Sequence, residues 1–268
     1  MPTSTHITVF DRVVCGVDRS DAGVSAARAA GLLTSPEGSL ALLAVNDTSI
    51  AVHAGWAMPH VLQELAEEAQ AALERGRTEA EPLHALEAKL VEGDPLHCLL
   101  AEIARREATL VAVGSHGISR ATGIALGSVS THLLHEAPCA VLVARGPIDV
   151  GRWPRNIVVG VDGSADSERA LDVARSLGKR FDVEVRAITA ARDAHVDLEA
   201  ARRIAPEVEE HDARALDALG VAAETSELVV LGSRGLRGLR ALGSLSERLA
   251  HDARHSVLVV RPQREPAA

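Results

Sequence analysis

Residues 113–130 read VGSHGISRATGIALGSVS, and residues 231–246 read LGSRGLRGLRALGSLS. In each stretch an apolar run ends at a glycine, and a later glycine–serine pair opens a segment with helical spacing of its apolar residues. A buried strand that leads through a glycine-rich turn into a helix is a unit of parallel α/β sheets. The chain contains this unit twice, but the second copy has two fewer residues before its glycine–serine pair.

The duplication extends along most of the chain. Matching segments are 11–30 with 155–174, 93–117 with 211–235, and 127–145 with 243–261. The offset between matched positions falls from 144 to 118 and then to 116, so about 25 residues are missing from the second copy before its third helix. We therefore expect two domains, 1–147 and 153–264, joined by a linker that contains glycine and proline.

Short apolar runs alternate with helical patterns in both copies. This alternation predicts an α/β protein made of two tandem doubly wound domains, each with a five-stranded, mainly parallel sheet flanked by helices. The segment 191–205 replaces the long helix expected at 58–80, so the second domain lacks most of its second helix. Its polar segment 206–211 predicts only a weak edge strand. The fifth strands, 140–145 and 256–261, end their copies as apolar runs, and we expect them to pair with each other because an uncovered edge strand favours a partner.

The composition disfavours several classes of protein. The 268 residues include 47% hydrophobic and only 1% aromatic residues, and the net charge is -9. An acidic chain with few aromatic side chains is a poor partner for nucleic acid. We find no signal-peptide pattern and no apolar run long enough to cross a membrane, so we expect a cytoplasmic protein with reduced thiols at Cys15, Cys98 and Cys139.

The carboxyl ends of the strands carry the candidate site. Asp18 follows the first strand, and its carboxylate could accept hydrogen bonds from a ribose or an adenine amine. An aspartate here could equally cap the next helix. The glycines and the helix start after the fourth strand predict a phosphate pocket, because backbone N–H groups there are unpaired. Its candidate residues are Gly114, Ser115, His116, Gly117, Gly127, Ser128, Val129 and Ser130. His116 could touch a phosphate or remain a solvated loop residue.

Motifs of other nucleotide and hydrolase families are absent: there is no GxxxxGK[ST], no GxGxxG after the first strand and no GxSxG. The first glycine loop has no lysine, so we expect a bound nucleotide to be hydrolysed slowly or not at all, and we assign no catalytic residue. Mg²⁺ could accompany the phosphates. The histidine pairs His132/His135 and His251/His255 lack further ligands, which favours histidines on a helix surface or near its C-terminus over a metal site.

The pattern G-x-x-G, nine residues, then G-[ST] runs without a gap through Gly114, Gly117, Gly127 and Ser128. With this pattern and Asp18, the chain resembles a tandem universal stress protein along nearly its whole length. The resemblance implies an adenine nucleotide α-hydrolase-like fold and a cytoplasmic stress-response regulator that binds adenine nucleotide, such as ATP, and forms homodimers. It also implies that Val45 presents its backbone to adenine. The alternative is a nucleotide-free structural or partner-binding protein that keeps only the fold.

The second copy retains equivalents of these positions but with altered spacing. They are Asp162, Gly232, Gly235, Gly243 and Ser244, with seven residues between the last two glycines. A shorter loop reaches less far round a triphosphate, so we expect this copy to be degenerate for ATP and retained for packing. Arg234, Arg237 and Arg240 could still support weak anion or AMP binding.

Overall fold

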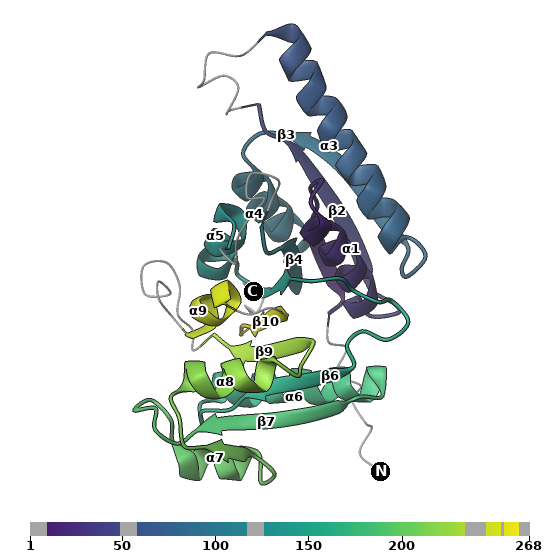
Figure 1. Cartoon of the computed structure of the whole chain (residues 1–268). Coiled ribbons are helices and arrows are strands. Elements are labelled where there is room, and N and C mark those ends of the chain that lie inside the picture. The colour runs from purple at the N-terminus through teal and green to yellow at the C-terminus, as the bar shows by residue number, and fades with distance from the viewer. Residues whose placement is uncertain (1–9, 49–57, 117–125, 234–244, 253–254, 263–268) are drawn as a thin grey trace, which may run out of the picture.

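The computed structural model describes residues 10–48, 58–116, 126–233, 245–252 and 255–262 (Figure 1). The first repeat comprises β1 (Arg12–Gly16), α1 (Asp21–Leu33), β2 (Ser39–Asn46), α3 (Pro59–Ala80), β3 (Leu86–Glu92), α4 (Pro95–Arg106), β4 (Leu110–Gly114), α5 (Ser128–Glu136) and β5 (Ala140–Ala144). The second repeat comprises β6 (Asn156–Gly160), α6 (Ala165–Phe181), β7 (Glu184–Ala190), α7 (Leu198–Ile204), β8 (Glu209–His211), α8 (Ala215–Ala223), β9 (Leu228–Gly232), α9 (Leu245–Asp252) and β10 (Ser256–Val260).

All ten strands form one sheet in the order β3-β2-β1-β4-β5-β10-β9-β6-β7-β8. Neighbouring strands are parallel within each repeat. The two repeats meet where β5 and β10 run antiparallel, with Leu258 opposite Leu142 and Val259 opposite Val141. The predicted pairing of the fifth strands is therefore confirmed.

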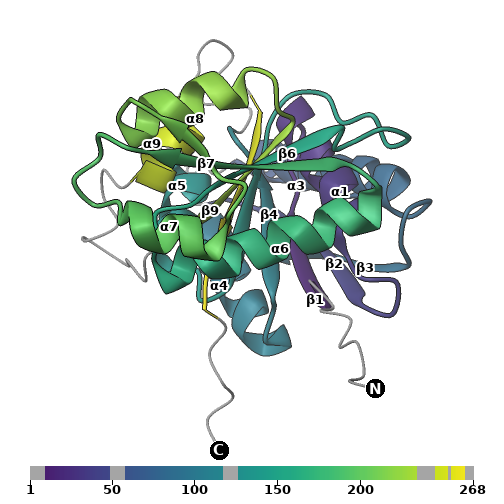
Figure 2. The ribbon, with the colours of Figure 1, turned by 90° about the horizontal axis from the view of Figure 1, so that it is seen from below.

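Helices cover both faces of the twisted sheet (Figure 2). One apolar core lies under α1, α3, α6 and α7, and the other lies under α4, α5, α8 and α9. Because side chains alternate along a strand, Leu142 of β5 enters the first core while Val141 and Val143 enter the second. Alanine, valine and leucine dominate both cores, as expected for a chain with so few aromatic residues.

Local signals set the helix starts. Ser20 caps α1 by accepting a hydrogen bond from the Gly23 N–H, and Asp94 caps α4 by accepting one from the His97 N–H at 2.8 Å. Pro95 stands at the first position of α4, where a missing N–H has no consequence. Ser20, and not Asp18, is therefore the residue that caps α1.

The second repeat departs from the first where the sequence lacks residues. The 22-residue α3 is replaced by the seven-residue α7, and β8 is a three-residue strand at the edge of the sheet. Both features were expected from the missing residues and from the polar character of 206–211. The expected fold class, with a second repeat that lacks most of its second helix, is confirmed.

His135 lies near a helix C-terminus, which is one of the two positions expected for it, but it is not on the surface. It stands in the last turn of α5, but it is buried, and its Nε2 lies 3.3 Å from the Glu247 carboxylate of α9. The reason is that α5 and α9 face each other across the junction between the repeats. Within the described residues no group of three or more His, Cys, Asp or Glu side chains is arranged to hold a metal ion.

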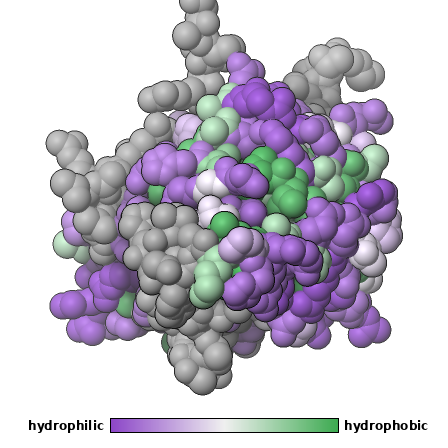
Figure 3. Space-filling view, turned by 90° about the horizontal axis from the view of Figure 1, so that it is seen from above, coloured by the Kyte–Doolittle hydropathy of each residue, from purple (hydrophilic) through white to green (hydrophobic). Residues whose placement is uncertain are grey.

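The outer surface is strongly polar. Figure 3 shows one face on which hydrophilic residues predominate and apolar residues form small patches. In the described parts of the chain, no helix combines the length and the apolar character needed to cross a membrane.

Candidate functional site

Asp18 and His116 approach each other through Ser20. Asp18 follows β1, and its Oδ1 accepts hydrogen bonds from the Ser20 N–H at 3.0 Å and the Ser20 hydroxyl at 2.5 Å. The same hydroxyl lies 3.2 Å from the carbonyl oxygen of His116, which follows β4. The carboxyl ends of β1 and β4 therefore meet, as the parallel topology requires.

Val45 lies at the same edge of the sheet as Asp18. Gly16 of β1 is in register with Leu43 of β2, and the Val17 N–H donates to the Leu43 carbonyl at 2.9 Å. Asp18 follows the end of β1 by two residues, and half-buried Val45 lies two residues beyond Leu43 near the end of β2. The two residues predicted for the nucleoside end therefore lie at the carboxyl ends of neighbouring parallel strands.

The start of α5 is tied to the end of β4. The Gly127 N–H donates to the Ser115 carbonyl at 2.7 Å, and the Ser130 hydroxyl donates to the Gly114 carbonyl at 2.6 Å. Gly127 is the N-cap of α5 and supplies no side-chain hydrogen bond to the first turn, which begins at Ser128 and Val129. The positive end of the helix dipole therefore lies beside β4, where an anion would be stabilised. Gly117, the remaining predicted glycine of this loop, lies outside the described residues.

Two predicted site residues have structural tasks that the sequence did not indicate. Ser130 is buried, and its hydroxyl is engaged by Gly114, so only its backbone remains as a donor for a ligand. At Gly114 a Cβ atom would lie 2.7 Å from the Ala22 carbonyl carbon and 2.9 Å from the Gly23 nitrogen. The start of α1 alone therefore requires glycine at 114.

Ser115 is likewise enclosed. Its side chain is fully buried, and its Oγ lies 2.9 Å from the Nδ1 of His116. Its N–H donates to the Ala144 carbonyl at the end of β5. These contacts fix the orientation of the peptide that leads from β4 into the glycine loop.

The second repeat reproduces the same edge. Asp162 Oδ1 accepts hydrogen bonds from the Ser164 N–H at 2.9 Å and the Ser164 hydroxyl at 2.5 Å. At Gly232 a Cβ atom would lie 2.6 Å from the Asp166 backbone, which matches the crowding at the equivalent glycine of the first repeat. Gly235, Gly243 and Ser244 lie outside the described residues.

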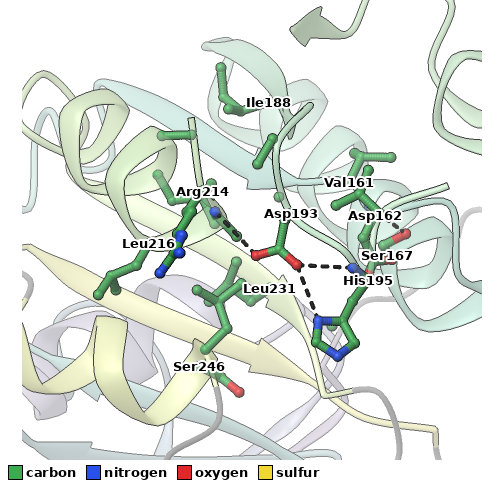
Figure 4. A pocket seen from close by; sticks show the side chains of 18 of the residues that line it. Val161, Asp162, Ser167, Ile188, Asp193, His195, Arg214, Leu216, Leu231 and Ser246 are labelled. Atoms are coloured by element: carbon green, nitrogen blue, oxygen red, sulfur yellow. Dashed lines mark hydrogen bonds and ion pairs between the residues drawn. The ribbon is translucent and has the colours of Figure 1, made fainter. Parts of the chain in front are cut away.

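A cavity of about 730 Å³ opens at this edge of the second repeat (Figure 4). The ends of β6, β7 and β9, the segment 192–196 and the first turns of α8 and α9 form its walls. Its apolar floor includes Ile188 and Leu231, from the core under α8 and α9, and Val161, from the core on the other face of the sheet, also lines the cavity; each is at most 3% exposed. We refer to it below as the second-repeat cavity.

Asp193 organises one wall of the second-repeat cavity. Its carboxylate accepts hydrogen bonds from the His195 N–H at 3.1 Å and from the Ala215 N–H at the start of α8 at 3.3 Å, and it lies 3.2 Å from the His195 Nδ1. Burial favours the neutral acid, but these hydrogen bonds outweigh it and lower the pKa of Asp193. The segment that replaces α3 therefore rebuilds a wall beside the sheet.

Apart from Asp162, sequence reasoning did not identify the charged residues of this cavity. They include Arg192, Asp193, His195, Arg214 and Arg248. The one available signal was the position of Arg192 and Asp193 directly after a predicted strand. Arg214 and Arg248 stand at helix starts that are distant in sequence, and only the folded sheet brings them to one opening.

Comparisons with known proteins agree on one family. The sequence profile described as the universal stress protein family matches residues 10–145, 154–226 and 204–261. A universal stress protein of Mycobacterium tuberculosis is 32% identical over 185 residues, which cover 58% of this chain and 62% of that protein. A universal stress protein of Mycolicibacterium smegmatis is 31% identical over 192 residues, which cover 60% of this chain and 64% of that protein. The chain thus spans less than two thirds of the length of these relatives.

Solved structures of similar proteins share the fold. The crystal structure of a universal stress protein from Archaeoglobus fulgidus superimposes with a TM-score of 0.72 and 22% identity, and the match covers 94% of this chain and 96% of that chain. The crystal structure of a protein described as a universal stress protein from Pseudomonas aeruginosa superimposes with a TM-score of 0.64 at 18% identity. At these identities the likeness establishes the architecture.

Proposed function

Since the chain belongs to the universal stress protein family, we propose that its first repeat binds ATP as a regulatory ligand and hydrolyses it slowly or not at all. The observation that carries this proposal is the convergence of Asp18, Val45 and the start of α5 at one edge of the sheet. We expect the protein to act in the cytoplasm as a stress-response regulator, as the resemblance implies.

The residues divide into a nucleoside end and a phosphate end. Asp18 has one carboxylate oxygen engaged by Ser20, and the other can accept a hydrogen bond from a ribose hydroxyl or an adenine amine. Val45 would offer its backbone to adenine. The N–H groups at the start of α5, with Gly117, would hold the phosphates, and His116 lies beside them. Magnesium, when bound, would neutralise phosphate charge, and oxygen atoms of the phosphates and water would be its ligands.

A bulky residue at the start of α5 tests the phosphate end. Gly127 has φ -71° and ψ 157°, which valine can adopt, so Gly127→Val should fold and yet block the close approach of a phosphate. We expect calorimetry to show loss of ATP binding. Gly151→Val is the matched control, because a Cβ atom there meets only Asp149 Oδ1 at 3.7 Å. Unchanged affinity in folded Gly127→Val would overturn the assignment.

Asp18→Ala tests the nucleoside end in the same titrations. It should weaken the binding free energy of ATP by about 1.5–3 kcal/mol, which is the contribution of a hydrogen bond to a charged group. The affinity for inorganic triphosphate should stay nearly unchanged. Ser20→Ala separates recognition of the nucleoside by Asp18 from the role of Asp18 in holding its turn. This variant removes the hydrogen bond between the Ser20 hydroxyl and Asp18 but keeps the carboxylate. Equal losses for ATP and triphosphate, or equal losses in both variants, would contradict this orientation. Extraction of the purified protein and chromatography for adenine nucleotide distinguishes it from a nucleotide-free, partner-binding protein.

A further inference from the structure

Two arginines of the second-repeat cavity have no side-chain partner among the described residues. Most arginines of the described residues make a side-chain hydrogen bond or ion pair, and those without one are Arg152, Arg203, Arg214 and Arg248. The last two line the second-repeat cavity. An arginine that lines a cavity without an acidic partner is available to bind an anion bidentately.

The two guanidinium groups come from neighbouring helices. Arg214 is the N-cap residue of α8, where its side chain makes no capping bond, and Arg248 stands in the first turn of α9. Helices α8 and α9 contact each other. The matching positions of the first repeat, at offsets of 118 and 116, hold Leu96 and His132. The arginine pair is therefore specific to the second repeat.

The other walls limit the size and charge of a ligand. The apolar floor is formed by Ile188 and Leu231, which are buried in the core under α8 and α9, and it suits a flat, weakly polar body. Carboxylates of Asp162, Asp193 and Asp217 also line the cavity. A triphosphate would bring several further negative charges close to them, whereas a phosphate monoester carries a charge of about -1.5 to -2 at pH 7, which two arginines balance.

We propose that the second-repeat cavity is a separate site for a phosphate monoester with a planar body, its phosphate held by Arg214 and Arg248 and its body resting on the apolar floor. In this site the arginine side chains hold the phosphate, in place of the glycine loop proposed for the first repeat. The site does not depend on ATP binding by the first repeat. Two sources share this chemistry, a nucleoside monophosphate and a non-nucleotide aryl phosphate.

Calorimetry on the full chain tests the proposal. AMP and 1-naphthyl phosphate represent the two sources, and ATP without magnesium and inorganic phosphate are compared with them. All titrations use the Asp18→Ala/Gly127→Val background, which disables both the nucleoside end and the phosphate end of the proposed first site, so that a working first site and a failed one give the same starting point. The variants are Arg214→Ala and Arg248→Ala, with the glutamine substitutions in reserve should alanine disturb the helix starts. Arg203→Ala is the matched control, since it removes another exposed, unpartnered arginine of the second repeat from α7.

We expect at least one monoester to bind more tightly than ATP and inorganic phosphate. Each cavity variant should weaken it about 10-fold or more, as loss of a charge-assisted hydrogen bond does, while Arg203→Ala leaves it within about 2-fold. If only AMP binds, the ligand is a nucleoside monophosphate. If AMP and 1-naphthyl phosphate both bind, the site accepts the wider class of aryl phosphates. Absence of saturable binding by either monoester, or equal losses in the cavity variants and the control, would overturn the proposal.

Discussion

At the scale of single residues, Glu102 shows how the chain accommodates an enclosed charge. Its side chain is only 6% exposed on α4. Arg105 Nε donates to Glu102 Oε2 at 2.9 Å, and Arg106 Nε donates to Oε1 at 2.6 Å. The hydrogen bond from Arg105 is the largest influence, and it outweighs burial to lower the pKa of Glu102 to about 2. The carboxylate therefore stabilises the folded state only while it is ionised.

Acid should remove this contribution. The folded pKa of about 2 lies below an unfolded value of about 4.3, so the stabilisation is present above the unfolded pKa and is lost as the pH falls towards 2. The difference corresponds to about 3 kcal/mol. Urea unfolding at a series of pH values should show a steeper loss of stability between about pH 5 and 2 for the native chain than for Glu102→Gln. Exposed Glu136→Gln is the control for the change in charge, and parallel curves for all three proteins would contradict this role.

At the scale of elements, local patterns predicted the strands and helices but not the contacts between their ends. Apolar runs with glycine and polar breaks predicted β1 to β5 and their counterparts, and the shifts in offset predicted the short α7 and β8. The crowding of Gly114 against α1 could not be predicted, because it arises from an approach between segments some ninety residues apart. The engaged hydroxyl of Ser130 and the cavity around Asp193 have the same origin. Each depends on how closely two distant backbones pack.

The β5–β10 ladder is the element that joins the repeats. Val141 and Val257 lie in it at 0% and 1% exposure. Lysine at either position would place a charge in an apolar core, which should cost about 3 kcal/mol or more. We therefore expect Val141→Lys and Val257→Lys to lower the unfolding midpoint and to make the linker at 146–155 sensitive to protease. Val221→Lys is the control, since this valine is 62% exposed. Unchanged protease sensitivity and unchanged mass by light scattering in both variants would show that the ladder is not what holds the repeats together.

At the scale of the whole molecule, each repeat secures the fourth helix of the other. Arg145, which follows β5, donates to the Ala250 carbonyl of α9 at 3.1 Å, and Arg261, which follows β10, donates to the Ala137 carbonyl at the end of α5 at 2.6 Å. A cation is favourable at each helix C-terminus because of the helix dipole. Since β10 covers β5 within the chain, the predicted homodimer would need another surface. The homodimer and the domain limits 1–147 and 153–264 stay predictions.

This symmetric frame holds two unequal sites. Their inequality predicts that the whole chain binds about one ATP, because a triphosphate site needs its loop and helix start together. The second repeat has lost two residues from its glycine loop and about 25 beside the nucleoside end. At the edge that carries Asp162, the cavity walls include Asp193, from the segment that replaces α3, and Arg214, where the first repeat has Leu96.

Substitution of the two equivalent aspartates measures this inequality. Asp18→Ala should remove most of the bound ATP, whereas Asp162→Ala should leave ATP binding nearly intact, although both side chains hold the following serine in the same way. That shared contact makes each variant the structural control for the other, because any loss caused by a disturbed turn would appear in both. Calorimetric stoichiometry is the measurement. A value near two per chain, reduced equally by either substitution, would show that the shortened loop still binds a triphosphate and that duplication preserved two ATP sites.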